Sequence, residues 1–219
     1  MAVKIGLKYI DIWKESMEEQ VVEYEKEPIE KGKIVFYGPS NFTRWSARFG
    51  MKPVADVLRG ASGEKCVINR GFGSTCSEHQ LYYYSRMVRP LEPKVLVYHP
   101  MGNFSSFGYS AEEAWELGQR VVVWAETDFP GIQIYLSGPS PRRDPFNAVK
   151  IREIERTKGV MKAFCDASEN RHFISSYDYE PLASRNDIYV EDGVHFNQDG
   201  YDIYTEFYKG VLAEELKKF

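Results

Sequence analysis

Short hydrophobic runs recur along the chain and alternate with longer amphipathic stretches. The runs cover residues 34–37, 66–69, 95–98 and 132–137, with a fifth candidate at 172–175, and they are rich in β-branched and aromatic residues. Continuous apolar runs of this length are typical of strands that are buried on both faces of a parallel sheet. We therefore predict a sheet built from these five segments.

The segments between the predicted strands have helical character. Ser110 and Glu113 form the capping-box pattern that opens a helix, and we expect this helix to continue to residue 125. Further helices are expected at residues 145–167 and from Asp199 to the C-terminus. Strands that alternate with helices predict a three-layer α/β sandwich with a mainly parallel, doubly wound, flavodoxin-like sheet.

Residues 1–31 are expected to form an N-terminal helix that packs on this domain. Apolar residues recur there at spacings of three and four, namely at Ile10, Trp13, Met17, Val21 and Tyr24. The opposite face is acidic, and Pro28 ends the pattern. Because no repeat or linker follows residue 32, we expect one domain over residues 1–219.

Composition and charge exclude several classes of function. A net charge of −4 argues against binding of nucleic acid, which needs a concentrated basic surface. The longest apolar runs are far too short to cross a bilayer, so no membrane partner is expected. Cys66, Cys76 and Cys165 lack the spacing of metal ligands and suit a reducing compartment, so we expect a cytoplasmic protein.

Residues with catalytic chemistry follow the predicted strands. In an open α/β sheet, ligands bind at the carboxyl ends of the strands. Ser40 follows the first strand, and Asp192 and His195 stand near the C-terminus. A serine hydroxyl is a poor nucleophile unless a base takes its proton; His195 can be that base, and Asp192 can orient it. The sequence therefore predicts a serine nucleophile with a histidine–aspartate pair.

An oxyanion hole is also predicted. The candidate donors are the backbone N–H groups of Ser40 and Gly73 and the side-chain amide of Asn103, which follow the first three strands. Each residue alone has a plainer interpretation, Ser40 as a helix N-cap and the other two as turn residues. It is their order after successive strands that favours the catalytic interpretation.

With these positions, the chain resembles the SGNH (GDSL-type) hydrolase family. The family's serine, glycine, asparagine and Asp-x-x-His match Ser40, Gly73, Asn103, and Asp192 with His195, and its first, second and fifth blocks look like residues 32–45, 69–73 and 192–197. The resemblance implies a serine esterase that needs no metal or organic cofactor. It implies short acyl esters as substrates, and acetyl esters of carbohydrates are our preferred expectation.

Two residues depart from the family's pattern. Pro39 stands where the family usually has a small polar residue, and Phe104 replaces a carboxylate that often braces the third block. Proline lacks an N–H group, so any hydrogen bond from that position is lost. Neither departure removes a catalytic group.

Other residues are candidates for further contacts or sites. The candidates for substrate binding are Trp45, Phe72, His99, Phe104 and Arg142. Residues 71–76 lack the third glycine of a dinucleotide fingerprint. Cys76 and His79 lack a second pair of metal ligands, and we expect His79 on a helix surface.

Two alternatives to a short-chain esterase stay open from the sequence. The chain could be a catalytically impaired SGNH-fold protein that binds a glycan or acyl ligand, with Pro39 and Phe104 as the marks of that loss. It could also be an acylhydrolase that acts on lipid-type esters. In each case the expected partner is a small molecule or a saccharide.

Overall fold

A five-stranded parallel sheet forms the centre of the protein. The computed structural model describes residues 14–143 and 147–219. The strands are β1 (Ile34–Gly38), β2 (Val67–Gly71), β3 (Val95–Tyr98), β4 (Gln133–Ser137) and β5 (Arg171–Ile174), in the order β2-β1-β3-β4-β5. Every neighbouring pair is parallel. The chain thus winds outward in both directions from β1, which confirms the predicted doubly wound α/β fold.

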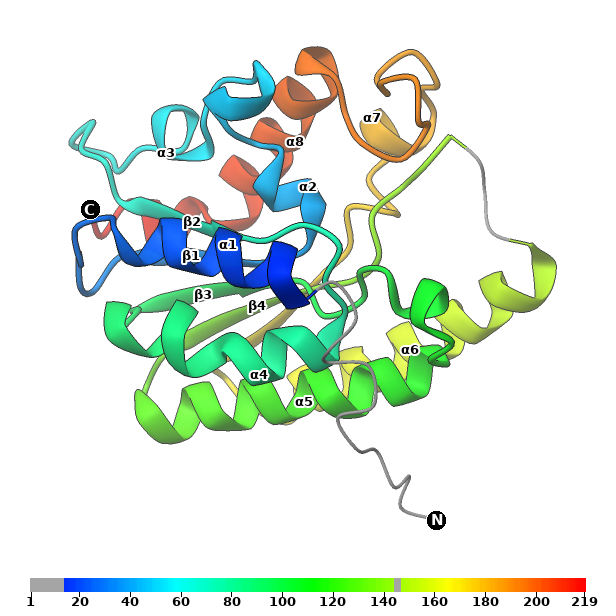
Figure 1. The fold of residues 1–219 in the computed structure, drawn as a ribbon, viewed down its shortest axis with the longest axis horizontal. Coiled ribbons are helices and arrows are strands. Elements are labelled where there is room, and N and C mark those ends of the chain that lie inside the picture. The colour runs from blue at the N-terminus through cyan, green and yellow to red at the C-terminus, as the bar shows by residue number, and fades with distance from the viewer. Residues whose placement is uncertain (1–13, 144–146) are drawn as a thin grey trace.

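Helices cover both faces of this sheet (Figure 1). One layer contains α1 (Lys14–Glu25), α4 (Ser77–Met87), α5 (Ala111–Asp128) and α6 (Ala148–Asp166). The other contains α2 (Ser40–Thr43), α3 (Val54–Val57), α7 (Glu180–Ala183), α8 (Gln198–Val211) and α9 (Ala213–Leu216). Single-turn helices η1 (Ala47–Phe49), η2 (Arg89–Leu91) and η3 (Phe104–Phe107) lie in the connections.

The two layers explain why the strands read as unbroken apolar runs. Successive side chains of a strand point to opposite faces. In β1, Val35 and Tyr37 are buried in the core beneath α4 and α5. Ile34 and Phe36 are buried in the second core, beneath α8. Both faces of the strand therefore need apolar residues.

The capping box predicted at Ser110 is confirmed. The Ser110 hydroxyl accepts the Glu113 N–H at 3.1 Å, and the Glu113 carboxylate accepts the Ser110 N–H at 2.9 Å. Helix α5 starts at the next residue and continues three residues beyond the predicted end. Helix α6 begins at Ala148, where the Asn147 side chain caps it; residues 145 and 146 of the predicted helix lie outside the described residues.

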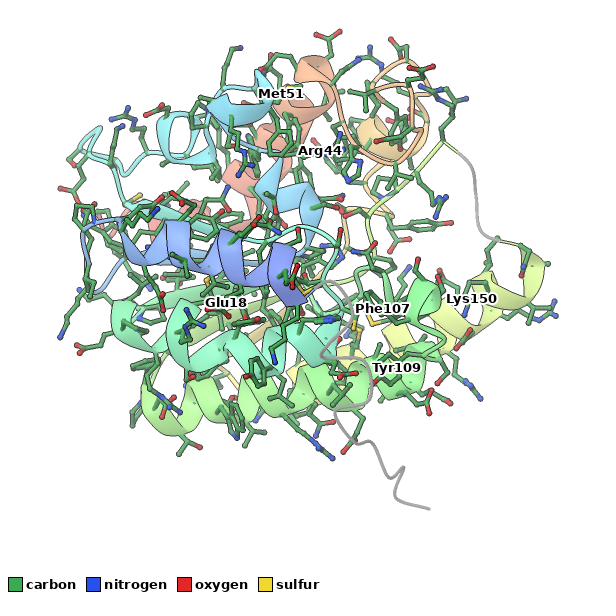
Figure 2. All side chains as sticks on the ribbon, viewed as in Figure 1. Glu18, Arg44, Met51, Phe107, Tyr109 and Lys150 are labelled. Atoms are coloured by element: carbon green, nitrogen blue, oxygen red, sulfur yellow. The ribbon has the colours of Figure 1, made fainter. Side chains whose placement is uncertain are left out.

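Helix α1 docks against α4, and Glu18 of this contact is labelled in Figure 2. Met17 and Val21 are fully buried, while Ile10 and Trp13 of the predicted stripe lie outside the described residues. Arg86 of α4 pairs with Glu18 at 2.6 Å and with Glu25 at 2.7 Å, so the acidic face of α1 is partly used for this contact. The helix ends at Glu25, three residues before Pro28.

The three cysteines are buried free thiols. Burial raises the pKa of Cys76 and of Cys165 to about 11, so neither thiol ionises near neutral pH. In the part of the chain that the structure describes, none of the helices has the length and apolarity needed to cross a membrane.

Candidate active site

Ser40, His195 and Asp192 form a continuous hydrogen-bonded chain. Ser40 is the first residue of α2 and stands two residues after the end of β1, whereas the other two lie in the loop that precedes α8. The Ser40 Oγ lies 2.7 Å from His195 Nε2, and the His195 Nδ1 lies 2.7 Å from Asp192 Oδ2. Ser40 and His195 are 155 positions apart in sequence, and the parallel sheet brings them to one edge. This is the geometry that activates a serine hydroxyl.

Asp192 holds its own turn as well as the imidazole. Its Oδ1 accepts the backbone N–H groups of Val194 and His195, both at 2.9 Å. Partial burial would raise the pKa of this carboxyl, but the hydrogen bonds from His195 and Val194 outweigh that effect and lower the pKa to about 2. Asp192 is therefore ionised over the whole working range and leaves only one tautomer available to His195.

His195 is poised to be a neutral base. Its side chain is 15% exposed, and this burial lowers the pKa of the imidazole. The Asp192 carboxylate acts in the opposite direction, and the positive charge of Arg44 lowers the pKa further. The Arg44 Nη1 lies 3.5 Å from Asp192 Oδ2. The net shift is downward, so the ring is unprotonated at neutral pH and can accept the Ser40 proton.

The three proposed oxyanion donors differ in whether their N–H group is available to a ligand. The Ser40 N–H is in the first turn of α2, where helix geometry leaves N–H groups without intrahelical partners. Asn103 lines the cavity beside Ser40 and donates one amide N–H to the Thr75 carbonyl at 3.0 Å, which leaves its second N–H available. The Gly73 N–H donates to the Gln20 Oε1 of α1 at 2.7 Å, and Gly73 is not among the cavity-lining residues. The structure therefore does not offer this N–H to a ligand.

Pro39 packs directly on the loop that carries Asn103. A Cβ at Gly102 would lie 2.3 Å from the Pro39 Cγ, so only glycine fits at this contact. Asn103 itself has φ +53°, a left-handed conformation that asparagine adopts more readily than most residues. The departure at Pro39 is thus accommodated by the small residue that faces it.

A small cavity of about 100 Å³ opens beside Ser40. Its wall includes three of the candidate contacts, His99, Phe104 and Arg142. Met101 and Pro139 add apolar surface. On this measure one water molecule needs about 10–15 Å³, so the cavity has room for a short acyl group.

Trp45 and Phe72, which were also expected to contact substrate, lie in the protein core. Trp45 is 1% exposed and stacks on Tyr201 of α8 at 5.6 Å between ring centroids. Phe72 is fully buried and stacks on Tyr37 at 5.6 Å. Neither lines the cavity. Large aromatic rings close to a strand end are drawn into the core by the apolar area that they bury.

His79 was expected on a helix surface, and this expectation is wrong. The residue is fully buried in α4, where its Nδ1 lies 3.3 Å from the Cys76 Sγ as part of the cap of that helix. Among residues 14–143 and 147–219, no three His, Cys, Asp or Glu side chains are grouped to hold a metal ion.

Three residues with a part in this site were not identified from the sequence: Gln20, Arg44 and Gly102. Gln20 lies on the polar face of α1, and no local pattern connects it with Gly73, which is 53 residues away. Arg44 is four residues from Ser40 and lies within residues 32–45, the segment that resembles the family's first block. Its contact with Asp192 depends on the distant loop that carries the aspartate.

Comparison with known proteins bears on the fold. No family model and no curated protein matches the sequence. A GDSL-like lipase from Bacteroides thetaiotaomicron superposes with a TM-score of 0.66 at 19% identity, covering 93% of this chain and 98% of that chain. A lipase/acylhydrolase from Enterococcus faecalis gives 0.65 at 19% identity, covering 84% and 96%.

A variant of an acetyl-xylooligosaccharide esterase from Geobacillus gives a TM-score of 0.62 at 14% identity, covering 84% of this chain and 95% of that chain. Likeness at such low identity reports on architecture, and the architecture agrees over 84–93% of this chain and 95–98% of the other chains. The chain has the α/β fold of the GDSL-type lipases and acylhydrolases, the SGNH hydrolase fold.

Proposed function

We propose that the protein is a serine esterase in which Ser40 is the nucleophile, His195 the base and Asp192 the residue that orients the base. The observation that carries this proposal is the chain of two 2.7 Å hydrogen bonds from Asp192 through His195 to Ser40. The similarity in fold to lipases and acylhydrolases supports the same reaction class.

The reaction proceeds through an acyl-enzyme. The Ser40 Oγ forms a bond to the ester carbonyl carbon while its proton moves to His195 Nε2. The negative charge on the carbonyl oxygen is met by the Ser40 N–H and the free amide N–H of Asn103. When the tetrahedral intermediate collapses, the carbon–oxygen bond to the alcohol breaks, and the alcohol leaves with the proton from His195.

A water molecule then completes the cycle. It gives a proton to His195 as it attacks the acyl carbon. The bond to Ser40 Oγ breaks, the serine recovers its proton from the imidazole, and the carboxylic acid is released. All the groups in these steps belong to the protein, the ester or water.

Short acyl esters, acetyl esters above all, are the substrates that the site favours. The cavity beside Ser40 is about 100 Å³, and the bulky side chains of Met101 and Phe104 form part of its wall. A carbohydrate as the alcohol part is supported by the fold of the acetyl-xylooligosaccharide esterase. We expect kcat/KM on 4-nitrophenyl esters to fall from acetate and butyrate to longer chains, and a preference for decanoate would indicate lipid-type esters instead.

Turnover of 4-nitrophenyl acetate by the wild type and by Ser40→Ala tests the function. We expect the variant to lose at least about a thousandfold in kcat, because a missing nucleophile costs orders of magnitude. Ser184→Ala, which changes an exposed serine after α7, is the matched control and should keep wild-type activity. Activity of Ser40→Ala within about threefold of the wild type would overturn the assignment.

A second candidate function is binding without turnover. The observation that favours it is the Gly73 N–H, which Gln20 already occupies, so that one expected donor of the oxyanion hole is missing. A wild-type protein that binds acetylated oligosaccharides but releases no acetate would establish this alternative.

A further inference from the structure

A buried histidine that the proposed reaction does not use lies in the wall of the catalytic cavity. His99 follows β3 directly, is 2% exposed, and lines the same cavity as Ser40. A Cβ at Gly38 would lie 2.9 Å from the His99 Cβ, so the residue sits directly against the end of β1. Its ring lies nearly perpendicular to that of Phe42, with 5.9 Å between the centroids. The imidazole is therefore held between the protein core and the cavity.

The two ring nitrogens of His99 form no hydrogen bond with the part of the protein that the structure describes, residues 14–143 and 147–219. Of the two, Nδ1 is fully buried. Burial lowers the pKa of His99 to about 4, so the ring is neutral at neutral pH, with one nitrogen a donor and the other an acceptor. Buried polar groups are nearly always paired, and an apolar side chain would fill the same space without that cost.

The cavity wall also carries polar side chains, among them Ser40, Asn103 and Ser140, but in the described part of the chain none of these three forms a hydrogen bond with the imidazole. Met101, Phe104 and Pro139 present apolar side chains to the cavity. Nε2 is the ring nitrogen that is not fully buried, so a bound molecule is the remaining source of a partner for this atom. A hydroxyl group suits the neutral ring best, because it both donates and accepts.

We propose that His99 is a specificity residue that hydrogen-bonds a substrate hydroxyl close to the ester bond. The substrates would then be short esters with a neighbouring hydroxyl. This inference rests on the proposed esterase function, since the cavity is identified by Ser40. The hydroxyl can belong to the acyl part, as in a 2-hydroxyacyl ester, or to the alcohol part, as in a partly acylated diol or sugar.

Two isosteric substrate pairs distinguish these sources. For the acyl part, 4-nitrophenyl glycolate is compared with 4-nitrophenyl propionate, in which a methyl group replaces the hydroxyl. For the alcohol part, 2-hydroxyethyl acetate is compared with propyl acetate. Each ratio of kcat/KM is divided by the same ratio for hydroxide-catalysed hydrolysis, which removes differences in intrinsic reactivity.

We expect a corrected preference of about tenfold or more for the hydroxylated member of one pair, because a site built for a hydroxyl rejects the analogue that lacks it. The pair that shows the preference identifies the source. His99→Leu should reduce that ratio to about one, whereas His99→Gln, which keeps a donor and an acceptor, should retain part of it. His172→Leu changes a histidine of β5 outside the cavity wall and is the matched control.

The outcomes separate this inference from the proposed function. If the wild type hydrolyses all four esters and both corrected ratios are near one, His99 does not select a hydroxyl and the inference fails while the esterase stands. The inference also fails if a preference exists but survives in His99→Leu. If His99→Leu does not fold, wild-type ratios near one still overturn the inference, and so does a preference that is unchanged in His99→Gln. If Ser40→Ala and the wild type are equally inactive on all four esters, the proposed function itself fails.

Discussion

The side-chain oxygen of Gln20 accepts the backbone N–H of Gly73 at 2.7 Å, which ties the N-terminal helix to the loop after β2. Tyr24, one turn later on α1, donates its hydroxyl to the Gly71 carbonyl at 2.6 Å. The same loop carries the Thr75 carbonyl that holds Asn103. Helix α1 is therefore connected, through two hydrogen bonds and a short loop, to a proposed oxyanion donor.

Gln20→Ala should lower stability and weaken catalysis together. The change leaves the Gly73 N–H without its partner, at a cost of about 1–2 kcal/mol in the free energy of unfolding. Asn103 is then held less firmly, so kcat should fall several-fold with little change in KM. Thermal melting and kinetics on 4-nitrophenyl acetate measure both effects.

Gln20→Glu is the matched control for this prediction, because a carboxylate oxygen can accept the same N–H. It should remain close to the wild type in both measurements. A gain of activity in Gln20→Ala would contradict the prediction and would show that Gln20 blocks a donor that substrate needs.

The pH dependence of kcat/KM should report the protonation of His195. The base must be neutral, and burial lowers its pKa from the ordinary value of 6.5. Activity should therefore be complete at neutral pH and fall as the pH drops through an apparent pKa below 6.5. Asp192 does not contribute to this limb, because its pKa is about 2. A profile that stays flat from mildly acidic to mildly alkaline pH would exclude His195 as the base.

Asp192→Asn should lower kcat by about 10²–10⁴ with little change in KM, because the carboxylate stabilises the imidazolium that develops in the transition state. His195→Ala should be the more damaging change, since it removes the base itself. Steady-state kinetics of the two variants on 4-nitrophenyl acetate makes the comparison. Wild-type behaviour of Asp192→Asn would mean that the serine has another activator.

Arg44→Gln should move the acid limb of the pH profile to higher pH. The guanidinium lies 3.5 Å from the Asp192 carboxylate and disfavours the protonated form of His195, so its removal raises the pKa of the imidazole. The Arg44 side chain is 34% exposed, so added salt should reduce the difference from the wild type. Arg48→Gln removes a nearby charge that has no contact with Asp192 and should leave the limb in place. An unchanged limb in Arg44→Gln would show that the charge is fully screened.

Gly102→Ala should strongly impair activity through a clash with Pro39. The new Cβ would lie 2.3 Å from a rigid proline ring, and the loop that carries Asn103 would have to move. A displacement of about 1 Å near the reacting atoms costs on the order of 100-fold in rate. Pro39→Gly in the same chain removes the ring and should restore part of the loss, which a double-mutant cycle measures. Additive effects of the two changes would contradict a direct contact.

The sequence by itself determined the architecture and the candidate catalytic residues. Runs of apolar residues short enough for strands, such as residues 95–98, became strands at the predicted positions. The capping residues at Ser110 located the start of α5. These features depend on local hydrogen bonds and on burial of both faces of each strand, and both are visible in the order of residues. Ser40 could be placed at the carboxyl edge of the sheet because it follows the first strand. His195 could be joined to it before any distance was known through the Asp-x-x-His spacing and the resemblance to the SGNH hydrolase family.

Only the tertiary structure decided what surrounds these residues. Trp45 and Phe72 follow strands just as the site residues do, yet both lie in the core, and His79 is buried in the first turn of α4. Whether a side chain points toward the cavity or toward the core depends on which helix packs against it. Such helix packing brings together segments that are far apart in sequence, so no local pattern reports it. The Gln20 contact with Gly73 and the Pro39 contact with Gly102 could not be predicted from the sequence for the same reason, since each requires two separate segments to meet within a few ångströms. Helix packing, rather than any local pattern, thus sets which of the strand-end donors can face a substrate.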